Sequence, residues 1–108
     1  MTLNEKIALK MGWDTQNNFI RIYFEGKPFD PTKHIEHAKL LQQKMVDDEW
    51  IVCINAMPKK EMIINKWPGV IECYATRPDA ESYEYLVYAN TEPAAIVALF
   101  CKVYGLEV

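Results

Sequence analysis

Two histidines stand three residues apart in the segment HIEH, a spacing that puts both on one face of a helix. His34 and His37 would then offer two imidazole nitrogens to one metal ion. No cysteine or acidic residue follows at a spacing that would close a tetrahedral site. A pair of solvated helix histidines explains the same spacing, so we rank a metal-dependent enzyme last among the functions considered.

Three acidic residues, Asp47, Asp48 and Glu49, come at the end of a predicted helix, where the helix dipole disfavours negative charge. The run indicates either a solvated exit from the helix or a contact with a cation or a partner. We count it among the residues of a possible interaction surface.

A second candidate surface lies in PKKEMIINKWPG, which we predict to be a loop of unusual length between two strands. Lys59, Lys60, Trp67 and Pro68 are its candidate contact residues, because exposed aromatic side chains often anchor protein interfaces.

The three cysteines, Cys53, Cys73 and Cys101, are widely spaced in apolar segments, and none stands beside a histidine or a basic stretch. Burial would raise the pKa of such thiols and leave them unreactive. They are typical of reduced core residues in a cytoplasmic protein. The sequence shows no catalytic set and predicts neither an enzyme nor a cofactor.

Five aromatic residues fall in the predicted strands: Trp50, Tyr74, Tyr83, Tyr85 and Tyr88. On an open sheet they would form a stacking platform for single-stranded RNA or DNA. The chain has 12 basic and 15 acidic residues and a net charge of −3, a balance that disfavours nucleic acid. We therefore expect these side chains in the core or at its rim.

Three helices are predicted to position these residues. Thr2 and Glu5 form a capping box ahead of an apolar stripe that Gly12 ends. Asp30 and Pro31 start a second, amphipathic helix through TKHIEHAKLLQQKMV. A third helix, capped by Asn90 or Thr91 and closed by Gly105, is apolar almost all round, so it must be buried on a broad surface.

Strands are predicted at residues 50–57, 70–76 and 83–89, the last two as an antiparallel hairpin. Residues 50–57 are apolar at both parities, which is typical of a strand covered on both faces. Residues 18–25 alternate between apolar and polar and predict a further strand, which the sequence leaves open.

Residues 1–108 form one domain of the α+β class in this interpretation. Helices on both faces of the sheet give a three-layer alpha-beta-alpha sandwich, with three helices and a small, mostly antiparallel sheet of three to four strands. No apolar run reaches the length that spans a membrane.

The segments LNEKIALKMGW, FDPTKHIEHAKLLQQKM and EPAAIVALFCKVYG together resemble the phage ABA sandwich domain family, small proteins encoded by phages and prophages of Gram-positive bacteria. The resemblance covers nearly the whole chain and rests on structural patterns. It implies an alpha-beta-alpha sandwich and no particular activity.

The leading hypothesis is a small accessory protein of phage or prophage type in the cytoplasm of a bacterial host. It would act as a non-enzymatic interaction module that binds a host or phage protein, with homo-oligomerisation through an exposed sheet edge as one form. A single-stranded nucleic-acid binder that uses the sheet aromatics is the alternative, ahead of the metal-dependent enzyme.

Overall fold

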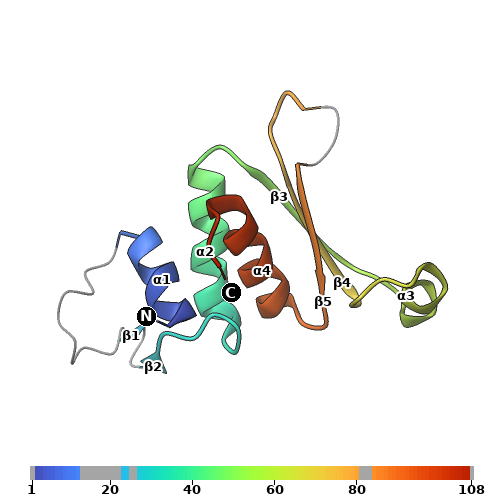
Figure 1. Cartoon of the computed structure of the whole chain (residues 1–108), viewed down its shortest axis with the longest axis horizontal. Helices are drawn as coiled ribbons and strands as arrows, with labels where there is room; N and C mark the ends of the chain where they lie inside the picture. Colours follow the sequence, from blue (N-terminus) through green and yellow to red (C-terminus); the bar gives the residue numbers. More distant parts are fainter. Residues whose placement is uncertain (1, 13–22, 25–26, 81–83, 108) are drawn as a thin grey trace.

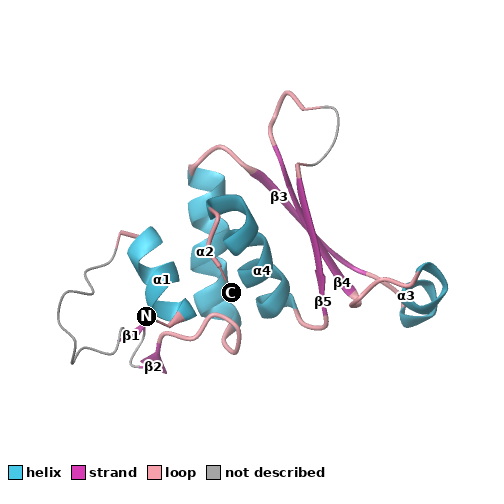
Figure 2. Ribbon diagram, viewed as in Figure 1, coloured by secondary structure: helices cyan, strands magenta, loops and turns pink. Residues whose placement is uncertain are grey.

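The structure is a computed structural model that describes residues 2–12, 23–24, 27–80 and 84–107. Its elements are α1 (Leu3–Lys10), β1 (Tyr23–Phe24), β2 (Lys27–Pro28), α2 (Ile35–Asp47), β3 (Ile51–Ala56), α3 (Lys59–Asn65), β4 (Ile71–Thr76), β5 (Tyr85–Ala89) and α4 (Glu92–Tyr104). Helices and an antiparallel sheet form one globule, which confirms the α+β class (Figure 2). Within the described ranges, no helix has the length and apolar character needed to cross a membrane.

The predicted caps of the first and last helices are confirmed. In α1 the Thr2 hydroxyl accepts the Glu5 N–H at 3.2 Å, and the Glu5 carboxylate accepts the Thr2 N–H at 3.4 Å. In α4 the Thr91 hydroxyl accepts the Ala94 N–H at 3.3 Å, and Gly105 ends the helix with a φ of 68°. These local contacts satisfy backbone groups that the helix itself leaves without partners.

The predicted start of the middle helix is wrong. Helix α2 begins at Ile35, and His34 is its N-cap. Asp30 forms a separate turn instead, in which its carbonyl accepts the N–H groups of Lys33 at 3.1 Å and His34 at 3.0 Å. Its carboxylate accepts the Thr32 hydroxyl at 2.7 Å. A short polar side chain that bonds within its own turn competes with its use as a helix cap.

The segment predicted to be a long loop contains a helix. Residues Lys59–Asn65 form α3, which begins after Pro58 and ends where Lys66 adopts a left-handed conformation with a φ of 57°. Lysine, glutamate and methionine favour helix, whereas the prediction gave more weight to the flanking prolines and glycine.

Strands β3, β4 and β5 form an antiparallel sheet in that order, which confirms the predicted hairpin. Strand β4 is central, so β3 and β5 are the two edges. The expected strand at residues 18–25 lies mostly outside the described residues. Of it, Tyr23–Phe24 pairs with Lys27–Pro28 as β1 and β2.

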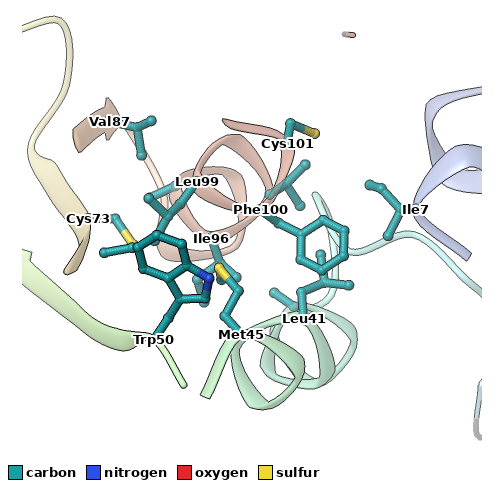
Figure 3. Packing of buried hydrophobic residues seen from close by; sticks show 14 of the residues in the cluster. Ile7, Leu41, Met45, Trp50, Cys73, Val87, Ile96, Leu99, Phe100 and Cys101 are labelled. Carbon is teal, nitrogen blue, oxygen red and sulfur yellow. The ribbon is translucent and has the colours of Figure 1, made fainter. Parts of the chain in front are cut away.

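The core lies between the sheet and the helices α2 and α4, and α1 packs on the far side of these two helices (Figure 1). Phe100 and Ile96 of α4 are fully buried among Leu41 of α2 and Ile7 of α1 (Figure 3). Cys73 closes the sheet side of the same cluster. The strongly apolar α4 is thus covered on several sides, as its composition required.

The expected second helical layer is not confirmed. Helices α1, α2 and α4 lie on one side of the sheet, and no described helix packs over the opposite face (Figure 1). The prediction that residues 50–57 are covered on both faces is wrong, because Ile51 is 44% exposed and Asn55 is exposed. We call this side the outer face. Its residues are Ile51, Cys53, Asn55, Glu72, Tyr74, Thr76, Leu86 and Tyr88.

Candidate functional site

A row of polar side chains crosses all three strands on the outer face. Glu72 of central β4 lies opposite Asn55 of β3 and opposite Tyr88 of β5. One carboxylate oxygen of Glu72 accepts from Asn55 Nδ2 at 3.2 Å, and the other accepts from the Tyr88 hydroxyl at 3.1 Å. Cross-strand pairs of this kind stabilise a sheet. They also hold a carboxylate at the middle of the face.

An aromatic pair stands at one end of this row. The Trp67 ring stacks on the Tyr88 ring with 5.6 Å between centroids and 12° between planes. The turn before β4 brings Trp67 there, because Lys66 takes a left-handed conformation and the Trp67 N–H bonds to the Met62 carbonyl at 3.0 Å. Gly69 permits the close approach that follows, since a Cβ on it would stand 2.3 Å from the Ala89 carbonyl oxygen.

Helix α3 connects the end of β3 to the start of β4 and extends the site beyond this end of the sheet, away from α4 (Figure 1). It presents Ile63, 62% exposed, and Ile64, 61% exposed. Two adjacent isoleucines with most of their surface in water are unusual for a helix that only supports a fold. The predicted contact residues Lys59 and Lys60 are exposed in the first turn of this helix.

Trp67 and Pro68, also predicted as contact residues, follow α3 directly. The structure therefore brings all four residues of the second predicted surface to one end of the sheet. Pro68 is exposed, whereas Trp67 is half-buried because Tyr88 covers one side of its ring.

The next cross-strand row on the outer face consists of Cys53, Tyr74 and Leu86. Hydrogen bonding to the Cys53 side chain raises the pKa of Tyr74, so the phenol is a weaker acid than usual. In the neighbouring row both oxygens of Glu72 already accept hydrogen bonds. The phenol of Tyr74 and the carboxylate of Glu72 therefore both take part in hydrogen bonds within this face.

The predicted acidic run lies elsewhere. Asp47, Asp48 and Glu49 precede β3, whereas Lys59 and Lys60 follow it, so the two halves of the predicted surface stand at opposite ends of that strand (Figure 1). All three acidic residues are exposed. Within one copy of the chain, the structure does not bring them together with the lysines.

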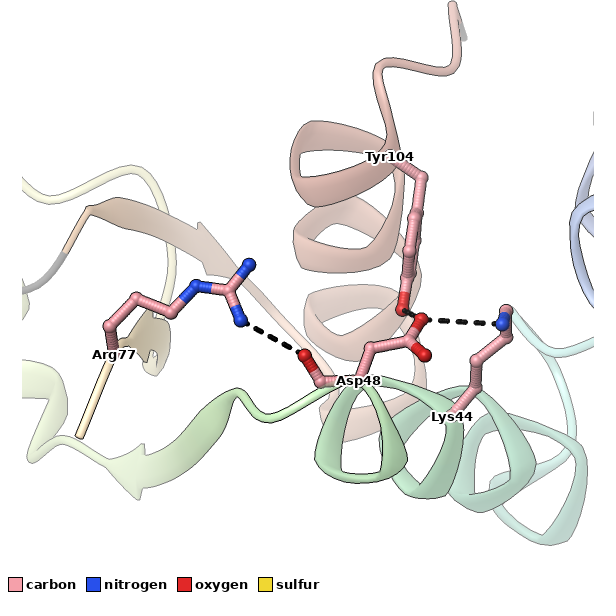
Figure 4. A network of polar contacts seen from close by, with 4 residues as sticks. All are labelled: Lys44, Asp48, Arg77 and Tyr104. Carbon is pink, nitrogen blue, oxygen red and sulfur yellow. Dashed lines mark hydrogen bonds and ion pairs between the residues drawn. The ribbon is translucent and has the colours of Figure 1, made fainter.

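Asp48 has partners of its own, shown in Figure 4. Its carboxylate accepts the Tyr104 hydroxyl of α4 and Lys44 Nζ at 3.3 Å, and its backbone carbonyl accepts Arg77 Nη1 at 2.9 Å. The hydrogen bond from Tyr104 is the main cause that lowers the pKa of Asp48. Burial, followed by the hydrogen bond to Asp48, raises the pKa of Tyr104.

Arg77 ties the same end of the sheet to the core. Its guanidinium carbon lies 3.7 Å from the centroid of the Trp50 ring, which is the geometry of a cation–π contact. Tyr85 meets the same ring edge-on at 5.5 Å. Trp50 is 8% exposed, so the prediction of a core position holds for this aromatic residue.

The aromatic prediction is only partly right. Tyr85 points to the core side, but Tyr74 and Tyr88 are half-buried on the outer face. Tyr83 lies outside the described residues.

The histidine pair is not presented as two outward-facing ligands. His37 is fully buried, its Nδ1 accepts the Asp30 N–H at 3.0 Å, and its ring stacks on Phe29 at 5.5 Å. His34 meets His37 edge-on at 4.8 Å. In the ranges the structure describes, no three histidine, cysteine or acidic side chains are grouped as metal ligands. The geometry of the pair is that of a packed core contact.

Sequence reasoning missed Ile63, Ile64, Glu72 and Tyr88 as surface residues. The two isoleucines were not predicted as surface residues because their segment was predicted to be a loop and not a helix. For the strands a signal existed, because Asn55, Glu72 and Glu84 each interrupt a largely apolar segment. The register places Asn55 and Glu72 on the same face, and polar residues on one face of a strand indicate that this face meets water.

Comparison of the chain with protein-family models, with curated proteins and with solved structures gives no match.

Proposed function

We propose that this chain is a non-enzymatic protein-interaction module whose contact surface is the outer face of the sheet together with α3. The exposure of Ile63 and Ile64 on α3, the helix that precedes the stacked Trp67 in the chain, carries the proposal. Clustered apolar side chains on a surface mark sites where another surface excludes water. Aromatic side chains held in place by neighbours are the usual anchors of such contacts.

The charge of the outer face favours a protein partner over nucleic acid. Its strand residues include no lysine or arginine, and Glu72 places a carboxylate at the middle of the face. Phosphate groups laid across the face would meet this negative charge. In addition, Trp67 covers one side of the Tyr88 ring, which reduces the ring surface left for a base.

The resemblance noted in the sequence supports a setting for this activity. We propose a phage or prophage accessory protein that works in the cytoplasm of a bacterial host and binds a host or phage protein. The helices and antiparallel sheet of the α+β class agree with that resemblance, whereas no described helix forms the second layer that it implies. The exposed surface supplies the contact.

The test is a pull-down from bacterial lysate, followed by calorimetry with each purified candidate. The double variant Ile63→Ser with Ile64→Ser should lose the partners that the wild type retains, because its apolar contact is gone. Ile35→Ser, at an isoleucine 39% exposed on α2, is the matched control and should retain them. Equal recovery with all three proteins, or no specific protein with any of them, would refute the proposal.

Single-stranded nucleic-acid binding is the second candidate. Tyr74 is half-buried on the outer face, and Lys59 and Lys60 stand at the end of the same sheet. Fluorescence anisotropy with labelled single strands tests it. Binding that weakens as salt is raised, and that Tyr74→Leu abolishes, would favour this candidate.

A further inference from the structure

The backbone of β3 has one edge that the sheet does not use. In antiparallel sheets, successive residues turn their N–H and C=O groups alternately to one side and the other. The Met57 N–H bonds to the Val70 carbonyl at 2.7 Å, and this pair continues the register of β3 with β4. Ile51, Cys53 and Asn55 therefore face β4, whereas Val52, Ile54 and Ala56 face outward.

The two edges of the sheet differ. At the β5 edge, Lys102 Nζ donates to the Leu86 carbonyl at 3.2 Å. At the β3 edge, none of the residues within the described ranges bonds to the outward groups of Val52, Ile54 and Ala56. The strand, IVCINA, also lacks the charges and proline with which proteins usually protect an edge.

We propose that two copies of this chain associate through antiparallel pairing of β3 with β3. A protein segment can pair with the whole row of alternating N–H and C=O groups only as an extended strand, so a strand is the partner that this edge fits. A two-fold axis at Ile54 sets Val52 of each copy opposite Ala56 of the other and Ile54 opposite itself. All three outward residues then exchange both of their backbone hydrogen bonds, and the two outer faces join into one surface.

The residues that flank β3 indicate that the strand comes from a second copy. Antiparallel pairing brings the start of one β3 to the end of the other. The acidic run Asp47 to Glu49 of each copy then lies at the same end as Lys59 and Lys60 of the other. Glu49 stands two residues before β3 and Lys59 begins α3 three residues after it, so the two charged segments share an end of the paired strands without a residue-to-residue register. Opposite charges thus meet at both ends, although the chain as a whole carries a net charge of −3.

This inference goes beyond the proposed function, because it concerns the edge of the sheet and not its face. It also accounts for both halves of the surface that the sequence analysis singled out. In a single copy the acidic run and the two lysines lie at opposite ends of β3. In the dimer, the acidic run of each copy lies near the lysines of the other.

A charge exchange tests the pairing by sedimentation velocity. The variant Asp47→Lys with Glu49→Lys and the variant Lys59→Glu with Lys60→Glu each place like charges at both ends. Each alone should dissociate about tenfold or more readily than wild type at low salt, because like charges across an interface repel. An equal mixture of the two should form a heterodimer. Weakening in both without rescue on mixing would overturn the proposed register.

Two further variants test the edge itself. Ala56→Pro removes a donor that β4 does not use, so the monomer should keep its circular dichroism spectrum while dimerisation is lost. Asn55→Cys sets a thiol opposite Cys53 of the second copy, at a non-hydrogen-bonded position close enough for a disulfide. With oxidised glutathione, this variant should form a covalent dimer, and the same variant carrying Cys53→Ser should not.

A wild-type protein that stays monomeric up to about 100 μM would overturn the inference, since interfaces of standard size bind at micromolar or lower concentration. Unchanged dimerisation of folded Ala56→Pro would do the same. The variant Ile63→Ser with Ile64→Ser should still dimerise. Loss of dimerisation therefore tests the β3 edge, and loss of partner binding tests the outer face.

Discussion

The indole ring of Trp67 lies on the phenol ring of Tyr88, with 5.6 Å between the ring centroids and 12° between the ring planes. This contact joins the segment after α3 to the last strand of the sheet. It exists because the chain turns sharply at Lys66 and passes close to Ala89 at Gly69. The contact surface that we propose therefore depends on one glycine that has no contact role of its own.

Gly69→Ala should destabilise the protein and separate Trp67 from Tyr88. The added Cβ would stand 2.3 Å from a backbone oxygen, so the chain must move. Overpacking of this kind costs about 1 to 3 kcal/mol in the free energy of unfolding. Urea denaturation measures the loss. Pro68→Ala, at the exposed neighbouring residue, is the control and should change the stability little. Equal stability of Gly69→Ala and wild type would contradict the packing described here.

In the variant Tyr104→Phe, the free energy of unfolding should fall less with rising alkaline pH than it does in the wild type. Burial and the bond to Asp48 raise the pKa of Tyr104 above its ordinary value of 10.0. Because the folded state holds this proton more tightly than the unfolded state, its contribution is complete below pH 10.0 and is lost as the pH rises through the folded pKa. Chemical denaturation across an alkaline series compares the two proteins. If the free energy of unfolding depends on pH in the same way in both proteins, Tyr104 does not contribute to the alkaline loss of stability.

The same substitution should raise the pKa of Asp48 towards its ordinary value of 3.8, because it removes the main cause of the lowering. In the wild type, the stability from Asp48 is present above pH 3.8 and is lost as the pH falls through the lower folded pKa. Carboxyl carbon shifts followed by NMR report this titration. An unchanged Asp48 curve in Tyr104→Phe would assign the lowering to Lys44 instead.

The three thiols should react at very different rates in the native protein. Burial raises the pKa of Cys73 to about 12 and also raises the pKa of Cys101. Both should react with Ellman's reagent only as fast as the protein opens. Cys53, half-buried on the outer face, should give the fast phase, and Cys53→Ser should remove it. A fast phase that persists in this variant would place another thiol in contact with solvent.

Local sequence patterns determined much of the helical structure. The Thr2 and Glu5 capping box, the Thr91 cap and Gly105 all act within a few residues of the chain, so no distant contact can easily override them. The apolar composition of α4 also fixed its burial in advance. The predicted start of α2 was wrong because Asp30 could either cap a helix or bond within its own turn, and it forms the turn.

Only the tertiary structure decided which face of the sheet is covered. The residues 50–57 are apolar at both parities, and this composition suits a buried strand as well as an edge strand with one wet face. The positions of α1, α2 and α4, all on one side, settle the matter for the described residues. The choice depends on contacts between segments far apart in the chain, about which a single sequence carries little information. For the same reason the sequence could single out Trp67 and Lys59 as candidate contact residues, whereas only the sheet register placed Glu72 and Tyr88 together on one face.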